Sequence, residues 1–274
     1  MGVGAVIVLL VVYAGLRWFE YTQVYHPSRH VVSWGTGIGP LRQDVYFNAN
    51  DGINLNAWFF PAATNSPRKQ TAILVCHGNG GNIAYLRSLY SRLAETGANV
   101  LLFDYRGYGN SEGRPGEEGT YRDAQAAYQW LRVAGFAATN IFAYGESLGG
   151  GIATELALRE PVGGLILEST FTSTADVGAE LFPWLPVRLL STIKYDNHAK
   201  LPRVKVPVLI MHSRDDRLIP YRLSQENMAA ANEPKLFQEI KGGHGAAGEE
   251  CHEGMEKFLS ALEAARRQGR EAKF

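Results

Sequence analysis

Ser147 lies between two glycines in the stretch GESLG, residues 145–149. The apolar run 141–144 before it predicts a buried strand, and residues 148–159 after it predict a helix. The order strand, G-x-S-x-G, helix is that of a nucleophile elbow, a sharp turn that presents the serine. Glycine is expected on both sides because side chains there would collide where the strand and helix cross. The alternative is a chance match in a glycine-rich loop.

A serine nucleophile needs a general base, and His244 is the candidate. It lies in KGGHG, residues 241–245, directly after the alternating segment KLFQEI, which places it at the end of a predicted strand. His252 falls within the last predicted helix, where a solvated surface position is expected.

The acid that orients the histidine is expected between the serine and the histidine in the chain. Asp215 and Asp216 both follow the apolar run 208–211, and their spacing does not separate them. Glu168, after the run 165–167, is a third candidate.

The loop HGNGGN, residues 77–82, follows another apolar run and predicts an oxyanion hole. The backbone N–H groups of Asn79 and Leu148 are the expected donors. A phosphate-binding loop is the alternative, but its GK[ST] ending is missing. His77 and His212 lack the clustered carboxylates of a metal site, so we expect no metal ion, and the chemistry needs no cofactor.

Apolar runs and helical patterns alternate along the chain, which predicts a mostly parallel, doubly wound α/β sheet. An antiparallel hairpin opens it, because NDG at residues 50–52 separates two strand-like segments. Residues 171–205 interrupt the alternation and predict a small cap over a pocket; a helix packed on the sheet edge is the alternative. The expected strands are 45–47, 53–60, 72–76, 100–103, 141–144, 165–167 and 208–211, and the expected helices are 83–96, 117–133, 148–159, 221–231 and 249–268.

The first 16 residues carry no charged side chain. They predict a membrane anchor over residues 1–19, a connector over 20–40 and the α/β domain over 41–268. A cleaved signal peptide and a buried helix are the alternatives. Arg17 and Arg29 follow the apolar run, which favours a cytoplasmic-facing domain by the positive-inside rule. Because the expected sheet and site lie beyond residue 40, we expect removal of residues 1–30 to leave them intact.

The composition excludes several classes of protein. Lys+Arg and Asp+Glu number 27 each, so the net charge of zero offers no basic field for nucleic acid. The two cysteines, Cys76 and Cys251, form no CxxC pattern and predict neither a disulfide framework nor a redox centre. A chain of 274 residues is long enough for one large α/β domain.

With these motifs assembled, the chain resembles the α/β-hydrolase superfamily, and within it the membrane-anchored abhydrolase-domain serine hydrolases. The matching stretches are HGNGGNI (77–83), FDYRGYGNSEGRPGEEG (103–119), YGESLGGGIA (144–153), LESTFTS (167–173), VPVLIMHSRDDRLIP (206–220) and GGHG (242–245). The family aligns its acid with the residue four positions before a proline, here Pro220, so the resemblance assigns the acid to Asp216. It also implies that Asp104 and Arg106 brace the loops around the site.

The resemblance implies cleavage of a carboxylic ester or thioester of lipid, lysolipid or acyl-protein type. The reaction would pass through an acyl-enzyme on Ser147, with His244 and Asp216 completing the catalytic triad. The implied partners are an ester substrate and a membrane. A serine peptidase of the same fold and a non-catalytic membrane-bound scaffold remain as alternatives. A peptidase would need an extra selecting domain, and a scaffold would have lost one of the site residues.

Overall fold

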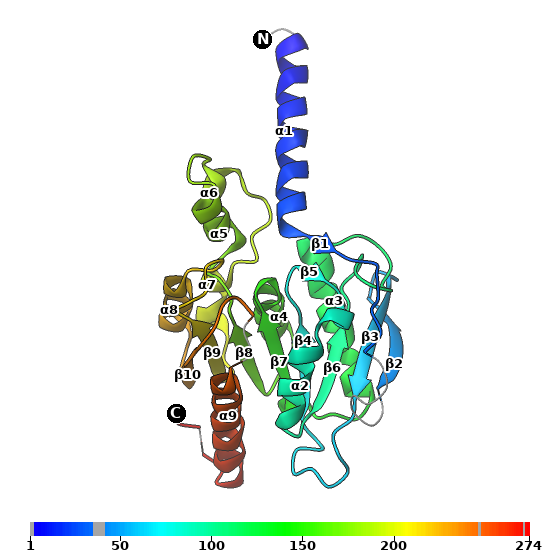
Figure 1. Ribbon diagram of the computed structural model, residues 1–274, viewed down its shortest axis with the longest axis vertical. Helices are drawn as coiled ribbons and strands as arrows, with labels where there is room; N and C mark the ends of the chain where they lie inside the picture. Colours follow the sequence, from blue (N-terminus) through cyan, green and yellow to red (C-terminus); the bar gives the residue numbers. More distant parts are fainter. Residues whose placement is uncertain (1–2, 35–41, 246–247, 271) are drawn as a thin grey trace.

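The computed structural model describes residues 3–34, 42–245, 248–270 and 272–274. Residues 35–41, which include the end of the expected connector and the expected start of the domain, lie outside the described residues, as do residues 1–2 of the expected anchor. Within the described residues the main sheet has eight strands in the order β10-β9-β8-β7-β4-β6-β3-β2 (Figure 1). The strands are β2 (Gln43–Asn48), β3 (Asn54–Phe60), β4 (Ala72–Cys76), β6 (Asn99–Phe103), β7 (Ile141–Glu146), β8 (Gly164–Glu168), β9 (Val208–Ser213) and β10 (Lys235–Ile240).

The pairing confirms the predicted architecture. Strands β2 and β3 form the antiparallel hairpin, β3 pairs antiparallel with β6, and the strands from β6 to β10 run parallel to one another. Every residue of β4, β6, β8 and β9 is buried, as expected for continuous apolar runs covered on both faces. The carboxyl ends of the parallel strands therefore meet at one edge, where an open α/β sheet places its ligands.

Helices cover both faces of the sheet and enclose two apolar cores. One core contains Leu93 of α2 and Phe258 of α9, and the other contains Leu131 of α3, Ile152 of α4 and Leu223 of α8. The bounds are α2 (Arg87–Glu95), α3 (Glu117–Val133), α4 (Leu148–Arg159), α8 (Tyr221–Ala230) and α9 (Glu249–Arg267), close to the predicted ranges. His252 lies in α9 with its side chain 35% exposed, as predicted.

Helix α1 (Val3–Val24) projects away from the body of the molecule (Figure 1). None of its residues is buried, which excludes the buried-helix alternative for the described residues. It is long and apolar enough to cross a membrane, with a mean hydropathy of 1.8, a test of length and composition that a signal sequence also passes. The helix ends five residues past residue 19, the expected end of the anchor, and it contains the charged residues Arg17 and Glu20.

The segment 171–205 contains three short α-helices, α5 (Thr174–Leu181), α6 (Val187–Leu190) and α7 (Asn197–Lys200), and the 3-10 helix Leu201–Arg203. Helices α5 and α6 rise from the body beside the lower end of α1 (Figure 1). We call residues 174–193 the cap. Residues from the cap and from α1 line one cavity together with Ser147, so the predicted cap over a pocket describes this segment better than a helix on the sheet edge.

Residues 25–34 contact the body of the domain, which the expectation for removal of residues 1–30 did not take into account. Tyr25 is buried, and its hydroxyl lies 3.0 Å from that of Tyr195. Strand β1 (His26–Pro27) pairs with β5 (Gly80–Gly81) inside the HGNGGN loop. Trp34 is also buried and donates its indole N–H to the carbonyl of Ala84. Two-residue strands carry no periodic pattern, so this attachment could not be predicted from the sequence.

Candidate active site

Ser147 sits at a sharp turn between β7 and α4. Its φ of 51° lies in the left-handed region that non-glycine residues seldom occupy, so the surrounding structure must hold it there. The backbone N–H of Ser147 donates to the carbonyl of Glu168 at 3.0 Å, and Thr170 Oγ1 donates to the carbonyl of Ser147 at 2.7 Å. The neighbouring loop after β8 therefore fixes this strained turn.

The two flanking glycines are explained by steric contact, as predicted. A Cβ atom on Gly149 would come within 1.9 Å of the Cys76 carbonyl oxygen, and one on Gly145 within 2.5 Å of the Gly149 carbonyl oxygen. Both contacts are with backbone atoms, which cannot rotate away. The close approach of β4, β7 and α4 therefore requires glycine at both positions.

His244 and Asp216 lie beside the serine. The His244 Nε2 atom is 3.0 Å from Ser147 Oγ, and the His244 Nδ1 atom is 2.8 Å from Asp216 Oδ2. Both distances are within the hydrogen-bond range. The loops after β7, β9 and β10 thus bring together three of the residues named from the sequence.

The local fold distinguishes the two aspartates. Asp216 is buried, and its Oδ1 atom accepts hydrogen bonds from the Leu218 and Ile219 N–H groups, each at 2.9 Å. Asp215 is exposed. This tight turn aims the Asp216 carboxylate at His244 and turns Asp215 toward solvent.

The pKa values of the pair shift in opposite directions. Burial would raise the pKa of the Asp216 carboxyl, but hydrogen bonds from His244 and from the Ile219 amide outweigh it and lower this pKa. Burial would lower the pKa of His244, but the hydrogen bond to Asp216 and the nearby carboxylates of Asp216, Glu146 and Glu168 raise it. The contact therefore favours an ionised Asp216 and makes the imidazole a stronger base.

Asn79 and Leu148 lie with Ser147 on the wall of the same cavity. Leu148 is the first residue of α4, so its N–H has no acceptor within the helix. The carbonyl of Asn79 accepts hydrogen bonds from the His26 N–H at 3.0 Å and the Tyr108 hydroxyl at 2.8 Å. These two contacts hold the carbonyl on the far side of the Asn79 Cα from its N–H group, and the sequence did not reveal either contact.

Glu168, the third candidate acid, has other partners. Its carboxylate forms an ion pair with Arg92 at 3.2 Å and accepts a hydrogen bond from the Tyr144 hydroxyl. Glu146, next to Ser147, is buried enough for its pKa to rise to about 7, with the Glu168 charge as the second cause. These two carboxylates thus act on His244 through their charge.

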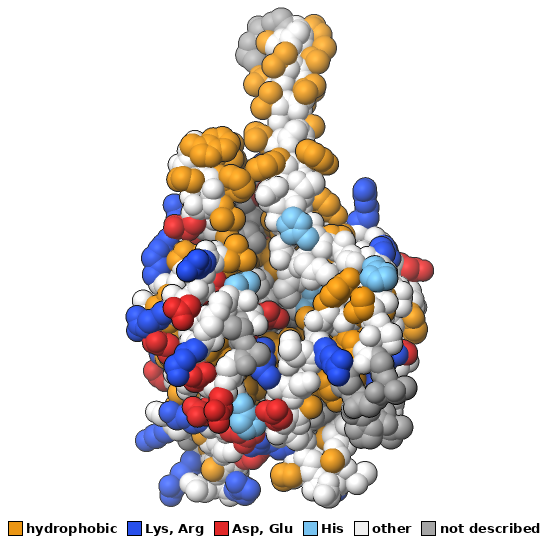
Figure 2. Space-filling model, viewed as in Figure 1, with side chains coloured by type: hydrophobic (Ala, Val, Ile, Leu, Met, Phe, Trp, Pro, Cys, Tyr) orange, Lys and Arg blue, Asp and Glu red, His pale blue; other side chains and the backbone are white. Residues whose placement is uncertain are grey.

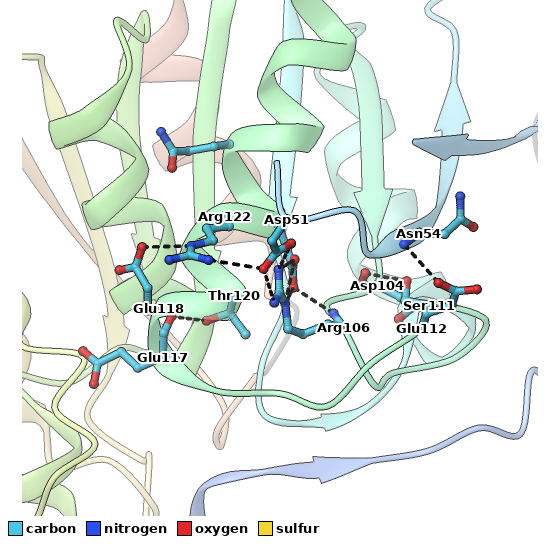
Figure 3. Close-up of polar contacts among 12 residues, drawn as sticks. Asp51, Asn54, Asp104, Arg106, Ser111, Glu112, Glu117, Glu118, Thr120 and Arg122 are labelled. Carbon is cyan, nitrogen blue, oxygen red and sulfur yellow. Dashed lines mark hydrogen bonds and ion pairs between the residues drawn. The ribbon is translucent and has the colours of Figure 1, made fainter. Parts of the chain in front are cut away.

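A network of ion pairs holds the loop after β6, where the resemblance implied that Asp104 and Arg106 brace the loops around the site (Figure 3). Arg106 binds the carboxylates of Asp51 and Asp123, at 2.8 Å each for the shortest contacts, and Asp51 also contacts Arg122 at 3.4 Å. Asp104 accepts a hydrogen bond from the Ile83 N–H at 2.9 Å, which ties the loop after β6 to the short 3-10 helix Ile83–Tyr85 that follows the HGNGGN loop. The network joins the β2–β3 hairpin to α3.

A cavity of about 350 Å³ opens above the serine, within the size range of ligand-binding pockets. Most of its wall is apolar and comes from α1 and the cap. The sequence did not identify this contribution of α1. The sequence feature that could have indicated this role of α1 is the pair Arg17 and Glu20, two charged residues next to a long apolar run.

Comparison with known proteins defines the class. The family model for the alpha/beta hydrolase fold matches residues 71–192. The alpha/beta hydrolase domain-containing protein WAV2 of Arabidopsis thaliana is 31% identical over 253 residues, covering 82% of this chain and 80% of WAV2. The chain therefore belongs to the α/β-hydrolase family, and it is a hydrolase of that fold.

Two further similarities concern a lipase sequence and a solved esterase structure. The lysophosphatidylserine lipase ABHD12 of Danio rerio is 30% identical over 218 residues, covering 67% of this chain and 57% of that protein. Among solved structures, an esterase of Pyrococcus furiosus, Pf2001, superposes with a TM-score of 0.73 at 20% identity, covering 88% of this chain and 98% of the esterase. At that identity the structural likeness supports the fold alone.

Proposed function

We propose that this protein is a serine hydrolase that cleaves a carboxylic ester or thioester of a lipid-like substrate. The observation that carries the proposal is the continuous hydrogen-bonded chain from Ser147 through His244 to Asp216. A lipid-like ester is favoured over a peptide as the substrate because the cavity above the serine is mostly apolar. The relatives also include a lysophosphatidylserine lipase.

In the proposed reaction, Ser147 Oγ attacks the acyl carbonyl carbon while its proton moves to His244 Nε2. Asp216 holds the imidazole with Nδ1 protonated and stabilises the imidazolium that forms. The N–H groups of Asn79 and Leu148 stabilise the negative charge that develops on the carbonyl oxygen. His244 then gives its proton to the departing alcohol or thiol.

The acyl group left on Ser147 is removed by water. His244 takes a proton from the water as its oxygen attacks the ester carbonyl, and this proton returns to Ser147 Oγ as the acid leaves. No metal ion or cofactor takes part in this scheme.

We further propose that α1 anchors the protein in a membrane. Its length and hydropathy support a membrane span. The contacts of residues 25–30 with the HGNGGN loop favour a retained helix over a cleaved signal peptide, because cleavage close to residue 30 would remove part of the fold. The charge pattern of Arg17 and Arg29 favours a cytoplasmic domain, which protease accessibility in sealed vesicles would test.

The test of the reaction is labelling with a fluorophosphonate probe together with hydrolysis of p-nitrophenyl butyrate. We expect the wild type to be labelled at Ser147, and Ser147→Ala to lose labelling and on the order of 10⁴–10⁶ in kcat. The matched control is Ser91→Ala, an exposed serine of α2 that does not line the cavity and should keep both labelling and hydrolysis. Labelling of another serine in Ser147→Ala would refute the assignment, and an unlabelled wild type would favour the scaffold alternative.

A further inference from the structure

The apolar cavity above Ser147 has two walls that come from distant parts of the chain. One wall belongs to the lower end of α1 and the other to the cap, and the Phe19 and Phe182 rings meet between them with centroids 5.4 Å apart. The side chains that form the apolar part of these walls include Leu16, Phe19, Val177, Leu181, Phe182 and Leu185. A helix that only tethered the protein would not contribute to this surface.

Polar contacts fasten the cap to α1. The Glu20 carboxylate accepts hydrogen bonds from Ser191 Oγ at 2.7 Å and from the backbone N–H groups of Thr192 and Ile193 at 2.7 and 3.0 Å. Arg17 pairs with Glu20 at 2.8 Å and donates to the carbonyl of Leu190 at 2.6 Å. The two charged side chains in the apolar helix therefore have a structural task, which is to hold loop 190–193 against α1.

The outer end of the cap is apolar and exposed. Leu181, Trp184 and Leu189 are 52%, 76% and 83% exposed. They belong to the part of the molecule that rises beside α1, and Figure 2 shows hydrophobic side chains over both α1 and the neighbouring lobe, while charged side chains gather on the body. Exposed apolar surface of this kind needs a covering partner. Because it is continuous with a helix able to cross a bilayer, lipid is the partner that fits.

We propose that α1 is part of the substrate site: α1 and the cap together form a subsite that takes the long acyl chain of a lipid ester directly from the bilayer. This inference rests on the proposed function, because the chain must lead to an acyl carbonyl at Ser147. The Arg17–Glu20 pair acts as a positioning element that keeps the second wall in place. The exposed tip of the cap lies at the lipid surface, so the substrate moves along apolar surface from membrane to serine.

The test uses the full-length protein in phosphatidylcholine vesicles with p-nitrophenyl palmitate and p-nitrophenyl butyrate as substrates. Leu16→Trp places a large ring in the α1 wall and should lower the palmitate-to-butyrate ratio of kcat/KM at least tenfold. Val12→Trp is the matched control, because Val12 lies one turn higher on α1, is 53% exposed and does not line the cavity. Its ratio should stay within twofold of the wild type.

A second measurement does not depend on how these variants fold. A long-chain fluorophosphonate with a diazirine near its chain end, attached to Ser147 of the wild type, should crosslink on irradiation to residues 16–24 or 177–190. Crosslinks confined to the body of the domain would overturn the inference. So would equal ratios for Leu16→Trp and Val12→Trp. A wild type that neither labels nor hydrolyses butyrate would instead refute the proposed function, so the two failures are distinguishable.

Discussion

The two ends of the cavity are built in different ways. At the polar end, Ser147, Asp216 and His244 follow strands β7, β9 and β10, and all residues of β9 and nearly all of β7 are buried. At the apolar end, the described residues of α1 and α6 include none that is buried, and α5 buries Ala175 alone. Ser147 and Asp216 thus follow buried strands, whereas β10 before His244 is only partly buried, and the groups proposed for binding rest on helices with few or no buried residues.

This difference separates chemistry from selectivity. Groups that act on a developing charge must be held in place before the reaction, which the buried strand ends can do. A surface for an apolar chain tolerates adjustment, and the local stability of segments with few buried contacts is low. Changes at the polar end should therefore affect all substrates alike, whereas changes at the apolar end should affect them according to chain length.

The largest effect in the polar end, apart from loss of Ser147, is expected for Asp216→Asn. An amide would favour the wrong tautomer of His244 and would not stabilise the imidazolium, so kcat should fall roughly 10⁴-fold. The loss should be the same for butyrate and palmitate esters. The measurement is steady-state kinetics with both substrates.

Asp215→Asn is the matched control, because the Asp215 carboxylate is exposed and the carboxylate in contact with His244 is that of Asp216. It should change kcat by less than a factor of about three, as expected of a surface substitution. If kcat falls more in Asp215→Asn than in Asp216→Asn, Asp216 is not the carboxylate that orients His244 during the reaction.

A deletion series examines where the apolar end joins the rest of the molecule. Deleting residues 2–30 removes the Tyr25–Tyr195 contact and the hydrogen bonds from His26 and Ser28 to the loop that carries Asn79. Each hydrogen bond is worth about 1 kcal/mol and the buried tyrosine more, so the free energy of unfolding should fall by on the order of 3–5 kcal/mol. The value of kcat/KM for butyrate should fall at least tenfold, because the loop that carries Asn79 loses an anchor.

Deleting residues 2–14 is the control for this series. It removes most of the apolar helix but keeps Arg17, Glu20 and β1, so butyrate hydrolysis and thermal stability should remain near those of the full chain. If the two deletions behave alike in chemical denaturation and in kinetics, residues 25–30 do not support the site.

The polar end could be predicted from the sequence because each part has a local signal. Apolar runs marked the strands, the two glycines around Ser147 marked the elbow, and His244 followed a strand-like alternation. Spacing alone left Asp215 and Asp216 open, and the tight turn made by the Leu218 and Ile219 amides separates them only in three dimensions.

The apolar end could not be predicted because its contacts join segments about 170 residues apart. Glu20 meets residues 191–193, and the bonding groups there are a hydroxyl and backbone N–H groups, which no periodic pattern reveals. From the sequence alone, Arg17 and Glu20 indicate only where the apolar run ends. They are the residues that fix the cap.

The smallest expected effect concerns the acid limb of the pH profile at the polar end. Protonated His244 cannot accept the Ser147 proton, so kcat/KM should fall as the pH drops through the His244 pKa. The hydrogen bond to Asp216 and the nearby carboxylates raise this pKa, so the limb should lie above the ordinary histidine value of about 6.5. The charge of Glu146 contributes to the rise in the His244 pKa, but less than the contact with Asp216 does.

Glu146→Gln should therefore move the acid limb of the pH profile to lower pH, with no hydrogen bond to His244 lost. Because the pKa of Glu146 is itself about 7, its carboxylate is only partly charged over the pH range of this limb, so the shift should be small. The exposed Glu226 on α8 provides the control Glu226→Gln, whose limb should coincide with that of the wild type. A limb in Glu146→Gln that stays in place or moves upward would show that the carboxylate beside the serine does not act on the histidine through its charge.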